Sequence, residues 1–157
     1  MFALRRFLAH FRAPKDPFER AVMELEKSDP TAAVNGFTTM LDAAKSDEQR
    51  ALLLNKRGVA HVRAGRREEA LRDFTAALAL VPRFAPALAN IGNLLVEDGN
   101  FDEAIVHYEA AIRADENYPI AHLNLAVAYR KTGRRADSVR ELRIAHRLEG
   151  RALFRRS

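Results

Sequence analysis

The chain has 157 residues, of which 48% are hydrophobic and 30% are charged, with a formal net charge of +5 and no cysteine. This length and composition are typical of one folded domain or one short repeat array with a hydrophobic core, and they exclude a mainly disordered chain. The lack of cysteine excludes disulfides, thiolate metal sites and thiol nucleophiles, and no apolar run approaches the roughly 20 residues that span a bilayer.

The positive charge is concentrated at the two ends of the chain. Residues 1–15 carry four basic side chains and no acidic one, while residues 134–157 carry eight arginines and three acidic residues. Because the whole chain has a net charge of +5, the residues between these ends sum to −4. The high isoelectric point therefore reflects the ends rather than the mildly acidic body.

The first predicted element is a basic amphipathic helix in residues 1–13. The segment FALRRFLAHFR places apolar and basic side chains on opposite sides of a helix, and a proline follows it. Three roles stay open: a cap packed on the rest of the chain, attachment to an anionic membrane surface, or docking on a partner or another copy. An organelle transit peptide has a similar composition. Candidate contact residues for the membrane or partner roles are Leu4, Arg5, Arg6, Phe7, Leu8, Phe11 and Arg12.

Residues 14–50 are predicted to form a helical hairpin. Residues 17–27 and 30–45 have the apolar spacing of two helices, and Ser28-Asp29 lies between them at the expected turn. This unit is a degenerate version of the clearer repeats that follow it, as is common for a terminal repeat.

Three blocks of 34 residues follow without a gap, at residues 51–84, 85–118 and 119–152. Written beneath one another, they align in five recurring columns. The columns are Gly58, Gly92 and Ala126; Gly65, Gly99 and Gly133; Ala70, Ala104 and Ser138; Phe74, Tyr108 and Leu142; and Ala77, Ala111 and Ala145.

The columns predict two antiparallel helices in each block. A small residue in the first helix lets the second helix approach closely. The glycine seven residues later ends the first helix, because glycine adopts the left-handed backbone at low cost. The remaining columns form an apolar stripe at helical spacing. Two further expectations concern polar residues: Asn100 and Glu103 have the spacing of a capping box, and Arg57 is expected to pack its methylenes while its guanidinium reaches water.

These columns at a period of 34 resemble the tetratricopeptide repeat family over residues 51–150. The resemblance implies an all-α, right-handed superhelical array of antiparallel helix-turn-helix repeats, three clear and one degenerate at the N-terminal side. It also implies that the first helix of each repeat lines a concave groove, which binds an extended peptide or a helix of a partner protein.

The expected groove residues lie on each first helix, on the side away from the second helix. Asn90 and Asn124 occupy equivalent positions, and a side-chain amide can both donate to and accept from a peptide group of a ligand. The alternative is that these asparagines only make local helix contacts. Basic residues outnumber acidic ones, which favours a mildly acidic ligand. The candidate groove residues are Asn55, Lys56, Val59, Arg63, Asn90, Asn93, Glu97, Asn124, Val127, Arg130 and Lys131.

The family's carboxylate clamp is not supported by this register. The clamp uses two lysines, two asparagines and an arginine over three successive repeats, and only one of the five positions matches. The residues at those positions are Asn55, Val59, Asn90, Ile120 and Asn124.

No catalytic, metal or cofactor site is predicted. The five histidines include no pair at metal-ligand helical spacing. Residues 98–109 have several oxygen ligands of a calcium loop, but Glu103 stands where that loop needs glycine. The C-terminal tail, residues 153–157, is basic, yet nucleic acid is a disfavoured partner because no basic-aromatic interleaving or known nucleic-acid-binding module is present.

Two interpretations of function follow. The leading one is a cytoplasmic, non-catalytic adaptor or scaffold that binds a protein or peptide in its groove. The alternative is a membrane-peripheral or self-assembling scaffold attached through the basic N-terminal helix. Self-association remains open because neither end of the array has a convincing polar cap.

Overall fold

The computed structural model describes residues 22–23 and 25–154, without the side chains of residues 151–154. Within these ranges the chain forms helices joined by short turns and contains no strand, so the predicted all-α fold class is confirmed. The predicted N-terminal helix, residues 1–13, lies outside the described residues, as does the end of the basic tail. The helices are α3 (Pro30–Asp42), α4 (Asp47–Arg63), α5 (Arg67–Leu80), α6 (Ala85–Glu97), α7 (Phe101–Ala114), α8 (Pro119–Lys131) and α9 (Arg135–Phe154).

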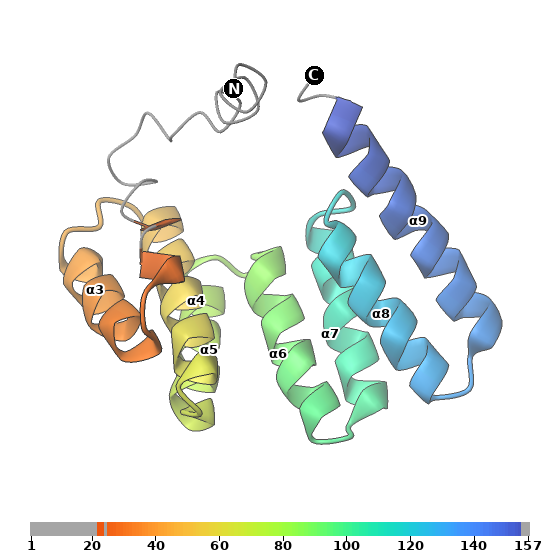
Figure 1. Cartoon of the computed structure of the whole chain (residues 1–157), viewed down its shortest axis with the longest axis horizontal. Coiled ribbons are helices and arrows are strands. Elements are labelled where there is room, and N and C mark those ends of the chain that lie inside the picture. Colours follow the sequence, from red (N-terminus) through yellow and green to blue (C-terminus); the bar gives the residue numbers. More distant parts are fainter. Residues whose placement is uncertain (1–21, 24, 155–157) are drawn as a thin grey trace, which may run out of the picture.

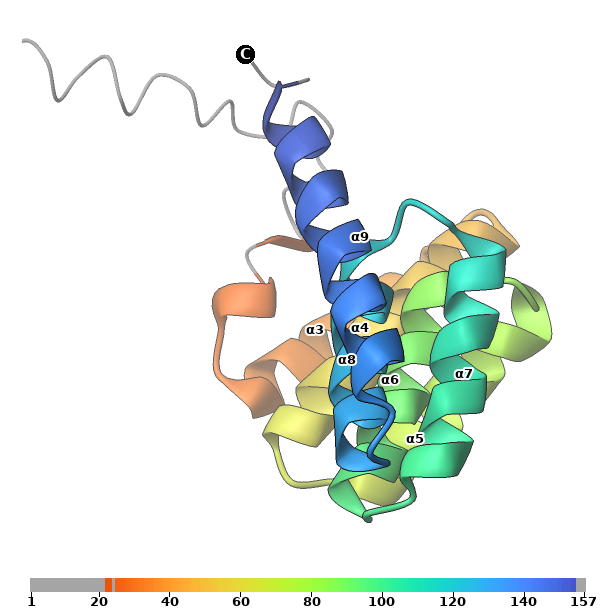
Figure 2. The same cartoon turned by 90° about the vertical axis from the view of Figure 1, so that its right-hand side faces the viewer.

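The helices pack as successive pairs in chain order, from α3 at one side to α9 at the other (Figure 1). Within a pair, α4 packs on α5, α6 on α7 and α8 on α9; between pairs, α5 contacts α6 and α7 contacts α8. The first helices α4, α6 and α8 also contact one another in sequence, so they form one continuous layer. The longest helix, α9, has 20 residues and extends past α8 at the end of the array (Figure 2).

The helix starts follow local chemistry at some positions and not at others. Asp29 caps α3, with its carboxylate accepting from the backbone amides of Thr31 at 2.9 Å and Ala32 at 3.3 Å. Ser46 caps α4 by accepting from the amide of Gln49. The capping box expected at Asn100 is not formed, because Asn100 precedes α7 but its side chain makes no capping hydrogen bond.

The glycines that were expected to end the first helices have the left-handed backbone. Gly65, Gly99 and Gly133 have φ angles of 72°, 78° and 80°, the only positive φ values in the part of the chain that the structure describes. At each turn, the amide of the residue after the glycine donates to a carbonyl of the helix that has just ended, as Arg66 does to His61 at 2.9 Å. Each first helix is therefore closed tightly enough for the next helix to run back along it.

The small residues of the first helices are points of close approach between the two helices of a repeat. A Cβ atom at Gly58 would lie 2.5 Å from the ring of Phe74, and one at Gly92 would lie 2.6 Å from the ring of Tyr108. In the hairpin before α4, the small residue is instead on the second helix, where Gly36 lies against Leu25. In that hairpin the second helix therefore carries the small residue and the first carries the large side chain that packs on it.

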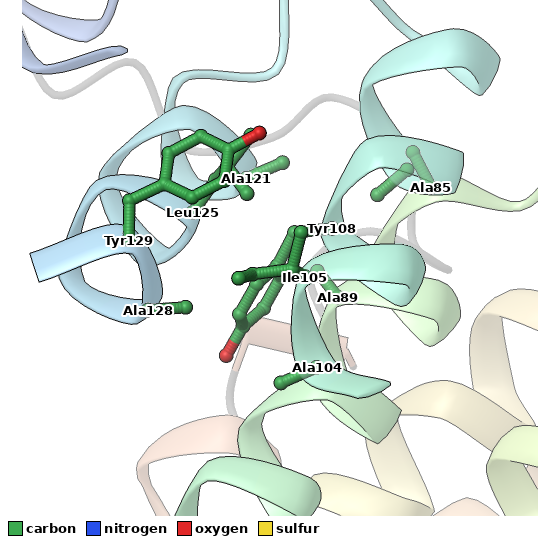
Figure 3. Packing of buried hydrophobic residues seen from close by; sticks show 10 residues of the cluster. Ala85, Ala89, Ala104, Ile105, Tyr108, Ala121, Leu125, Ala128 and Tyr129 are labelled. Carbon is green, nitrogen blue, oxygen red and sulfur yellow. The ribbon is translucent and has the colours of Figure 1, made fainter. Parts of the chain in front are cut away.

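The buried hydrophobic residues of the described chain form three clusters along the array, and the largest of them lies where α6, α7 and α8 meet. Tyr108 and Leu125, which are 2% and 3% exposed, pack with Ile105, Tyr129 and a set of alanines (Figure 3). The alanines keep the helix axes close, and the aromatic rings fill the space between them. No helix within the described ranges is long and apolar enough to cross a bilayer.

Candidate functional site

All eleven candidate groove residues lie on the first helices α4, α6 and α8, and together they define what is called here the first-helix surface. Their exposure varies. Asn55 is buried, with 4% exposed; Val59 and Val127 are each 37% exposed; the other asparagines are half-buried. Arg63, Glu97, Arg130 and Lys131 are exposed.

The asparagines form hydrogen bonds between neighbouring first helices. The Asn90 amide nitrogen donates to the Asn55 Oδ1 at 2.9 Å, which joins α6 to α4. The Asn124 amide nitrogen donates to the Asn93 Oδ1 at 2.8 Å, which joins α8 to α6. These contacts cross between repeats, so the asparagines join neighbouring first helices rather than contacting only their own helix.

Tyr108 fixes the orientation of Asn93 from the second helix of the same repeat. Its hydroxyl donates to the Asn93 Oδ1 at 2.8 Å, so this oxygen accepts two hydrogen bonds. Burial raises the pKa of Tyr108 to about 12, with the nearby Glu97 charge as a smaller cause. The hydroxyl therefore keeps its proton and remains a donor at neutral pH.

Two of the predicted basic groove residues are engaged by the hairpin that precedes α4. The Lys56 ammonium forms an ion pair with Glu26. The Arg63 guanidinium donates to the carbonyl oxygens of Glu26 at 2.8 Å and Ser28 at 3.0 Å, at the end of the helical residues 25–27. Arg63 thereby stabilises the carboxyl end of that helical segment.

Glu97 is also paired, with an arginine that begins α5. The Arg67 guanidinium contacts Glu97 at 2.8 Å and Asp98 at 2.5 Å, and it also donates to the Leu94 carbonyl at the end of α6. By contrast, Arg130 and Lys131 form no ion pair with any of the described residues. In the described part of the chain, Arg63 has no carboxylate partner either, but its guanidinium is bound to two backbone carbonyls, so the two cations of the first-helix surface without any such contact lie at the end of α8.

A hollow of about 190 Å³ opens beside the α4 part of this surface. Phe37 and Ala60 contribute apolar atoms to it, and the ion pair described above contributes charge. Its lining residues are Glu26, Phe37, Lys56, Val59, Ala60 and Arg63. Three of the predicted groove residues thus share one depression.

Arg57 corrects an expectation from the sequence. Its guanidinium does not reach water freely, because it donates to both carboxylate oxygens of Asp73 on α5, at 2.8 and 2.7 Å. A third hydrogen bond goes to the Thr38 hydroxyl on α3 at 3.1 Å. The Asp73 side chain is 8% exposed, so its charge would be costly without this partner. Hydrogen bonding to Asp73 raises the pKa of Arg57.

Two buried histidines lie in different repeats and do not form a site with each other. His122 Nδ1 lies 2.8 Å from the Glu141 carboxylate, which joins α8 to α9. His61 lies 3.8 Å from Asp73, and its Nδ1 has no hydrogen-bond partner. Burial lowers the pKa of His61, which keeps the ring neutral near pH 7. In the part of the chain that the structure describes, no three metal-ligating side chains come together.

Several residues that contact the first-helix surface from other helices could not be identified from the repeat columns. Tyr108 lies in the same aromatic column as Phe74. The column pattern does not show that the Tyr108 hydroxyl would donate a hydrogen bond to Asn93. Glu26 and Arg67 were missed because they neutralise groove charges from other helices. Nothing in their sequence positions indicates these contacts.

Comparisons with known proteins agree with the repeat fold. Residues 51–84 match the family model described as tetratricopeptide repeat, and residues 92–133 match one described as TPR repeat. A crystal structure of MamA is similar over 96% of this chain and 88% of its own, with a TM-score of 0.67 and 21% identity.

The descriptions of two further similar structures mention peptide binding. The second TPR of Spaghetti (RPAP3), bound to the HSP90 peptide SRMEEVD, matches 65% of this chain and 94% of its own, with a TM-score of 0.60 and 22% identity. YrrB, described as a TPR protein with an unusual peptide-binding site, matches 85% of this chain and 67% of its own, with a TM-score of 0.62 and 21% identity. At these identities the similarity establishes the fold.

Proposed function

The chain belongs to the tetratricopeptide repeat family, and from this premise we propose that it is a non-catalytic adaptor. Its first-helix surface binds an extended segment or a helix of another protein. The observation that supports this most strongly is the row of asparagine amides that crosses from α4 to α8.

The hydrogen bonds between the asparagines leave defined groups for a ligand. The Asn93 Oδ1 is used twice, which leaves the Asn93 amide nitrogen as a donor. Among the described residues, no donor reaches the side-chain oxygens of Asn90 and Asn124, which leaves them as acceptors. A peptide backbone offers one donor and one acceptor per residue, so an extended segment can pair with both kinds of group.

The remaining side chains of the surface suggest the character of the ligand. Val59 and Val127 offer apolar contact at each end of the asparagine row. Arg130 and Lys131 add positive charge beside Val127, so the ligand carries an acidic residue near the end that contacts α8. Lys56 contributes little further charge, because Glu26 already pairs with it.

Two surface variants with matched controls test this function. We expect Val127→Asp to weaken capture of the partner at least about tenfold, since it places a charge in an apolar contact. Asn90→Ala with Asn124→Ala should have the same effect. The controls are Val106→Asp, at an exposed valine of α7, and Asn35→Ala, at an exposed asparagine of α3.

Partners are captured from native extract on each variant and identified by mass spectrometry. Because the asparagine pair also joins helices, circular dichroism must confirm that each variant remains folded. Partners that are lost with both surface variants and kept with both controls support the adaptor function. If the same partners bind every variant, the first-helix surface is not the binding site.

A further inference from the structure

The last helix, α9, presents a side that corresponds to an inter-repeat contact elsewhere in the array. On α7, Ile105 is 6% exposed because it packs against α8, and the Glu109 carboxylate accepts a hydrogen bond from the Tyr129 hydroxyl at 2.9 Å. One repeat later, the same two positions are occupied by Val139 and Arg143 on α9. Both are exposed, and the described part of the chain places no further helix against them.

Exposure of Val139 alone would be weak evidence. Leu71, the corresponding residue of α5, is also 46% exposed although α6 follows it. On α9, a hollow of about 360 Å³ also lies around Val139. This α9 face is lined by Ala136, Val139, Arg140, Arg143, Ile144 and Arg147.

The charge of the α9 face has one sign. Three arginines line it, together with aliphatic side chains and no acidic residue. Arg140 is already paired with Asp137 at 2.8 Å and Glu141 at 3.2 Å. Arg143 and Arg147 have no ion pair within the described residues, so they can bind carboxylates of another molecule.

We propose that the α9 face binds an acidic amphipathic helix of a partner protein, separately from ligand binding on the first-helix surface. A helix fits because α8 occupies the corresponding place on α7. Its apolar stripe would contact Val139 and Ile144, and glutamate or aspartate beside that stripe would pair with Arg143 and Arg147.

Other occupants fit this face less well. The chain's own residues 1–15 carry four basic side chains and no acidic one, so the arginines would repel them. A membrane surface requires a wide face of apolar side chains, whereas Val139 is the one large apolar side chain that is exposed among the residues lining this face.

Two synthetic probes test the proposal with the intact chain. Both are amphipathic helices of about 18 residues, or five turns, with leucine and alanine on one side. One carries glutamate beside the apolar stripe and the other carries lysine. Binding is measured by fluorescence anisotropy. We expect the acidic probe to bind, more weakly at higher salt, and the basic probe not to bind.

Variants locate the binding site on the protein. Arg143→Glu with Arg147→Glu, and separately Val139→Asp, should weaken binding of the acidic probe at least about tenfold. Val106→Asp is the matched control on α7, and Asn90→Ala with Asn124→Ala tests the first-helix surface. Both variants should bind the acidic probe as tightly as the unmodified chain does. Probe binding at the α9 face then does not depend on the first-helix surface, so it can be tested whether or not the proposed adaptor function is correct.

Each of the following results would overturn the proposal. Equal binding of the two probes would show that the charge of the face does not select the ligand. Unchanged binding of the acidic probe by Val139→Asp would show that the probe does not bind at the α9 face. Binding of phosphatidylserine vesicles that is lost with the same variants would make the occupant a membrane. A dimer in light scattering that Val139→Asp dissociates would make it a second copy. Tighter probe binding after Phe7→Ser with Phe11→Ser would make it the chain's own N-terminal segment.

Discussion

The close approach of α6 and α7 at Gly92 leads to a quantitative prediction about stability. In Gly92→Ala, the new Cβ atom would lie 2.6 Å from the Tyr108 Cε1 and 3.0 Å from two further ring atoms. The ring cannot move aside freely, because it is 2% exposed and its hydroxyl is bonded to Asn93. The substitution therefore overpacks the interface between the two helices of this repeat.

Two opposing effects set the size of the change. Alanine in place of glycine inside a helix stabilises by about 1 kcal/mol. Overpacking a buried contact costs about 1–3 kcal/mol. Gly150 on α9 is the matched control, because a Cβ atom there meets nothing within 4 Å. We expect Gly92→Ala to have a free energy of unfolding about 1–3 kcal/mol lower than that of Gly150→Ala.

Urea unfolding followed by the helical circular dichroism signal measures both variants. A third variant, Gly92→Ala with Tyr108→Leu, reproduces the pair Ala126 and Leu142 of the next repeat and should recover part of the loss. If Gly92→Ala is as stable as Gly150→Ala, the ring moves aside at no cost and the argument for a close contact is wrong.

Two further predictions concern buried polar groups. Asp73→Leu or Arg57→Leu alone should lower the free energy of unfolding by about 3 kcal/mol, because each leaves a partly buried charge without its partner. The double variant should lose less than the sum of the two single losses. Strict additivity in this double-mutant cycle would show that the two side chains are not coupled. Because the pKa of His61 is lowered in the folded chain, the unfolded chain binds a proton more readily than the folded one does. The contribution of His61 to the free energy of unfolding is therefore fully present above about pH 6.5 and is lost as the pH falls below that value. His61→Leu should reduce this loss of stability at acidic pH, measured as the slope of the free energy of unfolding against pH. A smaller slope in the same direction should remain because of His107, whose pKa is also lowered by burial. An unchanged slope would mean that His61 does not contribute.

The sequence by itself was enough to determine the fold class and the repeat family. The glycines at positions 65, 99 and 133 have the left-handed backbone that was expected from their spacing. This succeeds because backbone sterics and helical periodicity act over a few residues, so they leave a readable pattern in each block. Gly92 and Tyr108 belong to two of the recurring columns, as Gly58 and Phe74 do one repeat earlier. The close approach of the two helices at the small residue could therefore be expected from the sequence.

The tertiary structure alone decided which polar side chains are already used. Asn90 pairs with Asn55 from a helix 35 positions earlier, and Lys56 pairs with Glu26 from a degenerate hairpin that follows no clear column. Arg57 was expected to reach water, but Asp73 and Thr38 hold it from two other helices. A hydrogen bond or ion pair depends on placement within a few tenths of an ångström between separate helices, and no residue pattern along one helix contains that distance.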